Sequence, residues 1–399
     1  MKIVFIAPFG IRPKGTLFAR MLPLAAGLQT LGHTVTIVAP PYTNPEDSGK
    51  VEMVRGVLIK NVRLGPSNKI ASAALLAYRL FRTARLEKPD LVHLFKPKGY
   101  GGVAAFAHIL LKQLGKRLPP LFIDSDDWEG PGGMNDLHPY SRAERIVFRL
   151  QESWLPPRAT GVTAASLTLQ SRLLGMGIPA EKIHYLPNCV DAGPAGNRTA
   201  ARRKLGILEG APVLLLYTRF FEFSQDKLHY LFAEICKKVP SVRFLVIGSG
   251  RNNEEQLLIR AGEEAGFSPA LILAGWVETD EIADYLAAGD VAIYPFADNL
   301  LNRSKCPAKL TELLLAEIPV VADRVGQITE YIRPGLSGVL CNPDDWQEMA
   351  DRTVDLLLDG TKGRAVGKSG RSFLLERFSW KDAAAELEKF YLRQQLLAP

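Results

Sequence analysis

Long apolar runs are missing from this chain of 399 residues. A helix that crosses a membrane needs about 18 or more consecutive apolar residues, and no such run occurs. The start, MKIVFIAPFG, contains a short apolar stretch, but glycine, arginine and lysine follow without a small-residue cleavage pattern. We therefore expect the first residues to form a buried strand rather than a signal peptide.

Cysteine and histidine are scarce, with four and six copies. The cysteines Cys189, Cys236, Cys306 and Cys341 lie far apart, with no CxxC pair and no histidine at zinc spacing. This pattern favours reduced thiols in a cytoplasmic protein, because disulfide frameworks belong to oxidising compartments. It also argues against a zinc site.

Two nucleotide-binding glycine signatures are absent as well. The segment FGIRPKGTLFAR (9–20) is not G-x-G-x-x-G, and Gly15 precedes Thr16 where a P-loop would have lysine. A glycine loop that opens a helix still offers backbone N–H groups to an anion. A plain tight turn explains the same residues equally well.

What is present is a regular alternation of apolar strands and helix-length segments, with 47% hydrophobic residues. Continuous apolar strands are typical of parallel sheets that are covered on both faces. The predicted strands are 2–8, 34–40, 89–95, 119–124, 161–166, 213–219, 243–250, 271–277, 291–296, 318–323 and 338–343. The alternation of strands and helices stops at 186–212, a segment rich in Gly, Pro and Ala, and then starts again. This interruption predicts two doubly wound α/β domains. Ligands of such sheets bind at the carboxyl ends of the strands, so we expect a site in a cleft between the domains.

Charge is distributed unevenly between the two halves. Residues 1–195 carry 24 Lys+Arg and 14 Asp+Glu, a net charge of +10, whereas residues 196–399 carry 25 and 28, a net charge of −3. The asymmetry indicates two domains with different partners.

The segment SKCPAKLTELLLAEIPVVAD (304–323) predicts a helix followed at once by a buried strand. Its leucines fall on one helical face, and Pro307 suits the first turn, where a missing N–H costs nothing. Lys309 and Glu312 lie on the other face, three residues apart. They form either a surface ion pair or an anion and sugar site at the helix start.

Motifs along the whole chain resemble those of retaining GT-B glycosyltransferases of family 4. In the first half they are the glycine loop, LGHTVTIVAP and IHYLPNCVD, and RFSWKDAAAELEKFY resembles the closing segment. In the second half they are YTRFFEFSQDK, FLVIGSG, ILAGWV, VAIYPF, CPAKLTELLLAEIPVVA, VGQITEYI and GLSGVL. The resemblance implies a Rossmann-like acceptor domain at 1–191, a linker at 192–211, a donor domain at 212–378 and a helix at 379–399 that returns to the first domain.

The resemblance also implies roles for individual residues. Glu312 would accept hydrogen bonds from the donor ribose, and Arg219 and Lys227 would stabilise the leaving diphosphate without a metal or other cofactor. Gly15 and Lys14 would approach the phosphate from the first domain. The remaining donor-binding residues that we predict are Gly248, Gly250, Trp276, Val277, Ser304, Cys306, Pro307, Ala308 and Lys309.

The segment DSDDWEG (124–130) allows three interpretations. In the resemblance, Asp126 takes the place of a histidine and would face the donor sugar or the acceptor as a catalytic group. A D-x-D pattern is also compatible with a magnesium site. Alternatively, the acids only cap a loop and a helix.

The chain departs from the family pattern at several positions. Ser304 stands where the first glutamate of Glu-x7-Glu is usual, Cys306-Pro307 replaces Phe-Gly, and Glu317 and Cys189 replace glycines. Because that first glutamate normally contacts the transferred sugar, the departures indicate a divergent member with an altered donor, or one without activity.

We expect a retaining glycosyltransferase that moves a sugar from a nucleoside diphosphate-sugar to a hydroxyl acceptor such as a glycan, a glycolipid or a small molecule. No nucleic-acid partner is expected. One alternative is a sugar-nucleotide epimerase of the same fold, which the few histidines disfavour. Another is a non-catalytic sugar-nucleotide-binding subunit, for which Ser304 is the main argument.

The segment NKIASAALLAYRLFRTARLEK (68–88) is basic, with five Lys and Arg against Glu87. Ile70, Ala74, Leu75, Tyr78 and Phe81 recur at roughly helical spacing. Such a helix could place a cytoplasmic protein on the anionic inner face of a membrane, next to a lipid-linked acceptor. The same apolar stripe could instead pack on the first sheet.

Overall fold

The computed structural model describes residues 1–10, 15–65 and 69–397. The chain divides into two compact units. Unit 1 comprises Met1–Cys189, Ser304–Cys306 and Phe378–Pro399, and unit 2 comprises Val190–Arg303 and Pro307–Arg377. None of the described helices is both long and apolar enough to cross a membrane.

Unit 1 is built on an eight-stranded sheet with the order β3-β4-β2-β1-β5-β6-β7-β8. All neighbours pair in parallel except β3 and β4, which form an antiparallel edge pair. The strands are β1 (Lys2–Ile6), β2 (Thr34–Ala39), β3 (Val51–Val54), β4 (Val57–Asn61), β5 (Leu91–Phe95), β6 (Leu121–Ser125), β7 (Gly161–Ala164) and β8 (Ile183–Tyr185). The central strands are fully buried, as their continuous apolar sequences predict.

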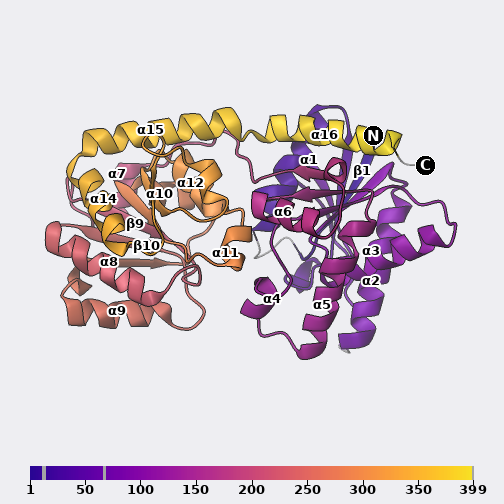
Figure 1. The fold of residues 1–399 in the computed structure, drawn as a ribbon, viewed down its shortest axis with the longest axis horizontal. Helices are drawn as coiled ribbons and strands as arrows, with labels where there is room; N and C mark the ends of the chain where they lie inside the picture. The colour runs from indigo at the N-terminus through magenta and orange to yellow at the C-terminus, as the bar shows by residue number, and fades with distance from the viewer. Residues whose placement is uncertain (11–14, 66–68, 398–399) are drawn as a thin grey trace. The chain divides into compact units, whose positions relative to one another are not determined.

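The helices of unit 1 cover this sheet (Figure 1). They are α1 (Leu22–Thr30), α2 (Lys69–Leu86), α3 (Gly99–Gln113), α4 (Met134–Leu137), α5 (Arg142–Trp154), α6 (Leu167–Gly175) and α16 (Trp380–Leu396), and a π-helical turn, Leu17–Met21, precedes α1. Although α16 is the last helix of the chain, it packs against α1. A Cβ at Gly27 would lie 2.8 Å from the Cβ of Ala384, so glycine permits this close approach.

Unit 2 is built on a six-stranded parallel sheet with the order β11-β10-β9-β12-β13-β14. The strands are β9 (Val213–Tyr217), β10 (Arg243–Ile247), β11 (Leu271–Gly275), β12 (Val291–Tyr294), β13 (Val320–Asp323) and β14 (Val339–Cys341). The order reverses at β9, from which the chain builds outward in both directions. Crevices at such a switch point are the usual ligand sites of open α/β sheets.

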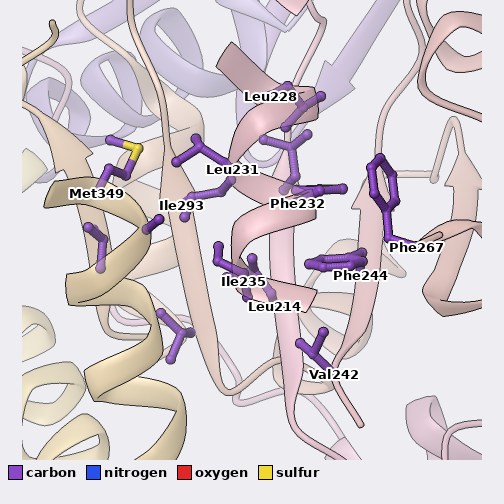
Figure 2. Close-up of a cluster of buried hydrophobic side chains, with 14 of the residues drawn as sticks. Leu214, Leu228, Leu231, Phe232, Ile235, Val242, Phe244, Phe267, Ile293 and Met349 are labelled. Atoms are coloured by element: carbon purple, nitrogen blue, oxygen red, sulfur yellow. The ribbon is translucent and has the colours of Figure 1, made fainter. Parts of the chain in front are cut away.

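The helices of unit 2 are α7 (Arg198–Lys204), α8 (Gln225–Lys238), α9 (Glu254–Ala265), α10 (Ile282–Ala287), α11 (Leu300–Ser304), α12 (Ala308–Leu315), α13 (Ile328–Tyr331), α14 (Trp346–Leu358) and α15 (Gly360–Arg377). Figure 2 shows the core between α8, α14 and the sheet. There the rings of Phe232 and Phe244 stack with centroids 4.1 Å apart, and Phe267 meets both edge-on. These packed aromatic rings join α8 to the sheet near the amino end of β10.

The prediction of two doubly wound α/β domains is confirmed, and each predicted strand is present in shortened form. The prediction missed β3, β4 and β8. Strand β3 carries Glu52 between its apolar residues, β4 has only three apolar residues before Lys60 and Asn61, and β8 has only three residues in all.

Within the basic segment, residues 69–86 form α2, which packs against α3 and the sheet. Leu76, Leu80 and Ala84 are buried, and the ring of Phe81 meets His108 edge-on. Arg79 donates hydrogen bonds to the carbonyls of Arg63 and Leu64. In the predicted apolar stripe, Ala74 and Tyr78 are exposed and Leu75 and Phe81 are half-buried, so α2 buries a neighbouring face in unit 1.

Candidate active site

Three side chains meet at the carboxyl end of the central strand of unit 2. Tyr217 ends β9, and its hydroxyl donates a hydrogen bond to the Glu312 carboxylate on α12. The Lys309 ammonium lies 3.4 Å from the centre of the Tyr217 ring. A hollow beside them is lined by residues of β9, β12 and the loops that follow, among them Glu222, Tyr294 and Phe296.

The charged residues of this cluster are half-buried, and the partial loss of water shifts their pKa values. Burial raises the pKa of Glu312 above its usual range, against the opposing effects of the Tyr217 hydrogen bond and the Lys309 charge. Burial lowers the pKa of Lys309 to about 8, and the Glu312 charge only partly offsets this. The second carboxylate oxygen of Glu312 is buried and has no hydrogen-bond partner among the described residues. A buried acceptor of this kind is costly unless a donor satisfies it.

Arg219 follows the same strand and reaches solvent. Its side chain is 47% exposed, its guanidinium lies over the Phe221 ring at 4.8 Å, and Glu222 is 3.6 Å away. An arginine so weakly held can reorient toward an anion. The structure thus places Arg219 at the strand end that the sequence predicted.

Lys227 is placed differently from Arg219. It is buried in the first turn of α8, where its ammonium donates to both Asp323 oxygens, at 2.8 and 2.7 Å, and to the carbonyl of Pro343, at 2.9 Å. A lysine has three N–H donors, so these contacts engage all of them. A diphosphate would have to displace one, and the predicted diphosphate contact of Lys227 stays a prediction.

The predicted glycines and Trp276 follow the neighbouring strands β10 and β11. Gly248 has φ +116°, and a Cβ there would lie 1.9 Å from the carbonyl oxygen of Thr218, so only glycine fits. The N–H of Gly250 donates to Glu255 at 2.8 Å. Trp276 is 65% exposed and Val277 is buried. The strand β10 neighbours β9 on the side opposite to β12, and β11 lies one strand further out.

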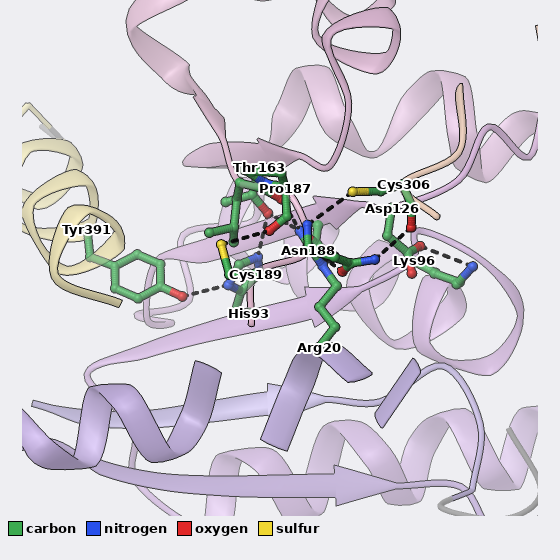
Figure 3. A network of polar contacts seen from close by, with 12 residues as sticks. Arg20, His93, Lys96, Asp126, Thr163, Pro187, Asn188, Cys189, Cys306 and Tyr391 are labelled. Carbon is green, nitrogen blue, oxygen red and sulfur yellow. Dashed lines mark hydrogen bonds and ion pairs between the residues drawn. The ribbon is translucent and has the colours of Figure 1, made fainter. Parts of the chain in front are cut away.

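In unit 1, a buried polar network lies beneath the carboxyl ends of β5, β6 and β7 (Figure 3). Arg20 donates to both oxygens of Asp124, at 2.8 and 2.5 Å, and Thr163 donates to the same carboxylate. His93 lies 2.6 Å from the hydroxyl of Tyr391, which belongs to α16. Burial lowers the pKa of His93 to about 3, so the imidazole is neutral at neutral pH.

Asp126 belongs to an adjacent ionic cluster. Its carboxylate is 3.1 Å from the Lys96 ammonium, which also contacts Asp127 at 2.5 Å, and Lys98 contacts Glu129 at 2.5 Å. Burial raises the pKa of Asp126 to about 7, against the lowering effect of Lys96. A carboxylate of this kind can exchange a proton near neutral pH.

The segment 304–306 belongs to unit 1. Asn188 donates from its backbone N–H to the Cys306 sulfur at 3.0 Å and from its side chain to the Cys306 carbonyl at 2.7 Å. Ser166 donates to the Ser304 carbonyl at 2.9 Å, and the Ser304 hydroxyl is buried without a described partner. Two predicted donor-binding residues are therefore fixed by side chains of unit 1, immediately before Pro307 and Ala308 begin α12.

Two further predictions concern the first loop and a metal. Lys14 lies outside the described residues, and a Cβ at Gly15 would meet no atom within 4 Å. Within the described ranges, no three His, Cys, Asp or Glu side chains are grouped so that they could hold a metal ion.

Sequence reasoning missed Tyr217, Arg20 and Asn188. The sequence did contain a signal for Arg20. This arginine lies on the same helical face as the apolar residues Leu17, Met21 and Leu24, which indicates a buried charge. The only sequence signal for Tyr217 is its position, because it is an aromatic residue with a hydroxyl group at the end of an apolar strand. Asn188 lies in the IHYLPNCVD motif, but its contact with Cys306 joins residues 118 positions apart.

The whole chain is similar to solved structures of the GT-B class. It matches sucrose-phosphate synthase from Thermosynechococcus elongatus with a TM-score of 0.76 and 17% identity, over 100% of both chains. It matches Anabaena HepE in complex with UDP-glucose with a TM-score of 0.72 and 18% identity, over 98% of this chain and 100% of that chain. These likenesses and the two parallel sheets define the GT-B fold, as predicted.

Sequence comparison gives the family. Residues 17–189 match the family described as "Glycosyl transferase 4-like domain", and residues 211–359 match "Glycosyl transferases group 1". The chain belongs to the group 1 glycosyltransferases.

A curated relative is the GDP-mannose-dependent alpha-(1-6)-phosphatidylinositol monomannoside mannosyltransferase of Mycobacterium tuberculosis, 26% identical over 235 residues, which are 57% of this chain. The match spans 60% of that relative's length.

Proposed function

We propose that this protein transfers a sugar from a nucleoside diphosphate-sugar to a hydroxyl group, with retention of the anomeric configuration. The observation that carries the proposal is the buried Glu312 oxygen without a described partner, beside Tyr217 and Lys309 at the switch point of the unit 2 sheet. Family membership makes a sugar nucleotide the expected occupant of this position.

In the proposed complex, ribose hydroxyls donate to the unpartnered Glu312 oxygen. Hydrogen bonds to a charged acceptor contribute about 1.5–3 kcal/mol each. The exposed Arg219 guanidinium turns toward the diphosphate, and the N-terminal end of α12 adds its partial positive charge. The approach of Gly15 and Lys14 to the phosphate, which the sequence predicts, is kept as part of this proposal.

The proposed reaction needs no protein nucleophile. The bond between the anomeric carbon and the diphosphate oxygen breaks, and a bond to the acceptor oxygen forms on the same face. The acceptor proton passes to the leaving phosphate, whose growing negative charge Arg219 stabilises. Asp126 faces the donor sugar or the acceptor hydroxyl in this proposal.

The acceptor that we propose is a hydroxyl of a glycan, a glycolipid or a small molecule. The mycobacterial relative carries a phosphatidylinositol monomannoside in its name, which supports a lipid-linked acceptor without identifying it. The buried, unpartnered Ser304 hydroxyl in place of a glutamate supports a donor that differs from those of typical members.

A thermal-stability screen with a panel of sugar nucleotides tests donor binding. A ligand present at 100 times its Kd stabilises the folded state by about 2.7 kcal/mol. Release of nucleoside diphosphate is then measured with and without acceptors. Acceptor-dependent release and a product of unchanged anomeric configuration support the proposal, whereas conversion of the sugar nucleotide without an acceptor supports an epimerase. Binding with neither reaction across the acceptor panel supports a sugar-nucleotide-binding subunit.

A further inference from the structure

Helix α5 of unit 1 exposes an apolar stripe to solvent. Ile146 is 60% exposed, Val147 43% and Leu150 59%, although an amphipathic helix normally buries such residues. The buried side chains of α5 are instead the polar Gln151 and Glu152. The helix therefore turns polar residues inward and aliphatic residues outward, which reverses the usual arrangement.

A second exposed stripe lies on the neighbouring helix α3. Phe106 is 46% exposed, Leu110 44%, and Leu114, at the end of the helix, 69%. The ring of Phe106 packs on Trp154 of α5, with centroids 4.6 Å apart, so the stripes meet at this pair. Figure 1 shows α3 and α5 side by side at one edge of unit 1. The two stripes together are called the α3–α5 surface.

Positive charge borders the α3–α5 surface. Arg142, Arg145 and Arg149 are exposed along one side of α5. The acids of α5 do not offset them fully: Glu152 is buried, and Glu144 is engaged in the capping box with Ser141. Residues 99–117, which include α3, contain three Lys and Arg and no Asp or Glu.

We propose that the α3–α5 surface binds an anionic lipid bilayer, with Ile146, Leu150 and Phe106 at the headgroup boundary and the arginines on the lipid phosphates. Aliphatic residues beside a basic band are the features that hold an amphipathic helix in the membrane interface. Charge complementarity selects an anionic bilayer over an uncharged one. The predicted membrane contact of 68–88 concerns a separate helix and stays a prediction, since Tyr78 on α2 is 56% exposed.

The inference concerns unit 1 alone and needs no donor or acceptor, so it can fail independently of the proposed function. The full chain is co-sedimented with vesicles of phosphatidylcholine, and with vesicles in which part of this lipid is replaced by phosphatidylglycerol, at low and high salt. We expect binding to the anionic vesicles that weakens with salt. No binding, or binding that ignores both lipid charge and salt, overturns the inference.

Two variants separate the apolar and the electrostatic contributions. Ile146→Ser/Leu150→Ser removes the exposed aliphatic groups, and Arg142→Gln/Arg145→Gln/Arg149→Gln removes the charges. Each basic residue near an anionic surface strengthens binding by about fivefold, so loss of all three charges should weaken binding by about a hundredfold. We expect a comparable loss for the double variant. Because all five side chains are exposed, circular dichroism and melting temperature should stay unchanged.

A matched control changes Leu257→Ser/Arg260→Gln on α9 of unit 2, where both residues are exposed. This variant should bind vesicles like the wild type. Equal losses in the control and the α5 variants would overturn the inference, as would a loss confined to Tyr78→Ser on α2. Sedimentation velocity without lipid tests whether a second copy of the chain covers the surface instead. A dimer that Ile146→Ser/Leu150→Ser dissociates would also contradict a bilayer contact.

Discussion

At the scale of single residues, the candidate site contains charged groups that are partly shielded from water. The Glu312 carboxylate accepts a hydrogen bond from Tyr217, the nearby Lys309 charge lowers its pKa against the effect of burial, and its other oxygen lacks a described partner. The free protein thus keeps an unsatisfied acceptor that a ligand can complete. Such preorganisation lowers the cost of binding, because the acceptor need not be stripped of water when the ligand arrives.

Glu312→Gln should retain the fold and lower kcat/KM for the donor by about tenfold or more, since removal of the charge weakens the hydrogen bonds to ribose. The comparison is steady-state kinetics against Glu317→Gln, a change of the same kind at an exposed position just after α12. The control should react like the wild type. A Glu312→Gln enzyme with near wild-type kcat/KM would rule out the ribose contact.

His93 makes the stability of unit 1 depend on pH. Its folded pKa of about 3 lies below the ordinary value of about 6.5, because burial disfavours the charged imidazole and outweighs the attraction of Asp124. The stabilising contribution is therefore complete above pH ~6.5 and is lost as the pH falls toward about 3. Between pH 7 and pH 5 this amounts to about 2 kcal/mol.

We expect His93→Gln to flatten this dependence. Urea unfolding at pH 7, 6 and 5 should show that the variant loses about 2 kcal/mol less than the wild type over this range, whatever its stability at pH 7. His184, whose pKa burial lowers to about 4, contributes equally to both proteins and cancels in the comparison. Identical slopes for variant and wild type would show that His93 does not titrate as described.

At the scale of elements, the carboxyl end of the unit 2 sheet is held together by a buried ion pair. Lys227 joins the start of α8 to Asp323 at the end of β13, and Asp323 also accepts from the Phe296 N–H at 2.7 Å. Burial raises the pKa of Asp323 to about 6, against the lowering effect of Lys227. The pair thus positions three loops around the hollow beside Tyr217.

Lys227→Met should lower the free energy of unfolding by about 3–5 kcal/mol, because it leaves the Asp323 charge buried and unpaired. Lys227→Met/Asp323→Asn should recover at least about 1 kcal/mol of this loss, since a neutral amide tolerates burial and can still accept from Phe296. Lys237→Met, on the exposed end of α8, should change stability by less than about 0.5 kcal/mol. Urea denaturation measures all three. Additive losses in the double variant would contradict a coupled pair.

At the scale of the whole molecule, the two halves of the chain carry net charges of opposite sign. The basic half contains most of unit 1, with the proposed bilayer surface, and the acidic half contains most of unit 2, with the candidate site at Glu312. Family membership joins these halves into one glycosyltransferase chain. The positive charge that a diphosphate needs is available from side chains and a helix end in unit 2.

We therefore expect transfer to survive excess EDTA, because Arg219 and the N-terminal end of α12 stabilise the leaving diphosphate in place of a divalent ion. Initial rates with EDTA, and with added magnesium or manganese, provide the measurement. Loss of activity on chelation, with rescue by either metal, would instead assign Asp124 and Asp126 as ligands.

The alternation of apolar strands and helices determined the fold class, because a strand buried on both faces must be apolar along its length and such runs are visible locally. Motif order likewise placed Glu312 and Arg219 near strand and helix ends. Tertiary structure alone decided which partners these groups meet. Lys227 pairs with Asp323 across 96 residues, Arg20 with Asp124 across 104, and α5 turns its aliphatic side to solvent. Pairing and burial depend on packing between distant segments, and no local pattern records that packing.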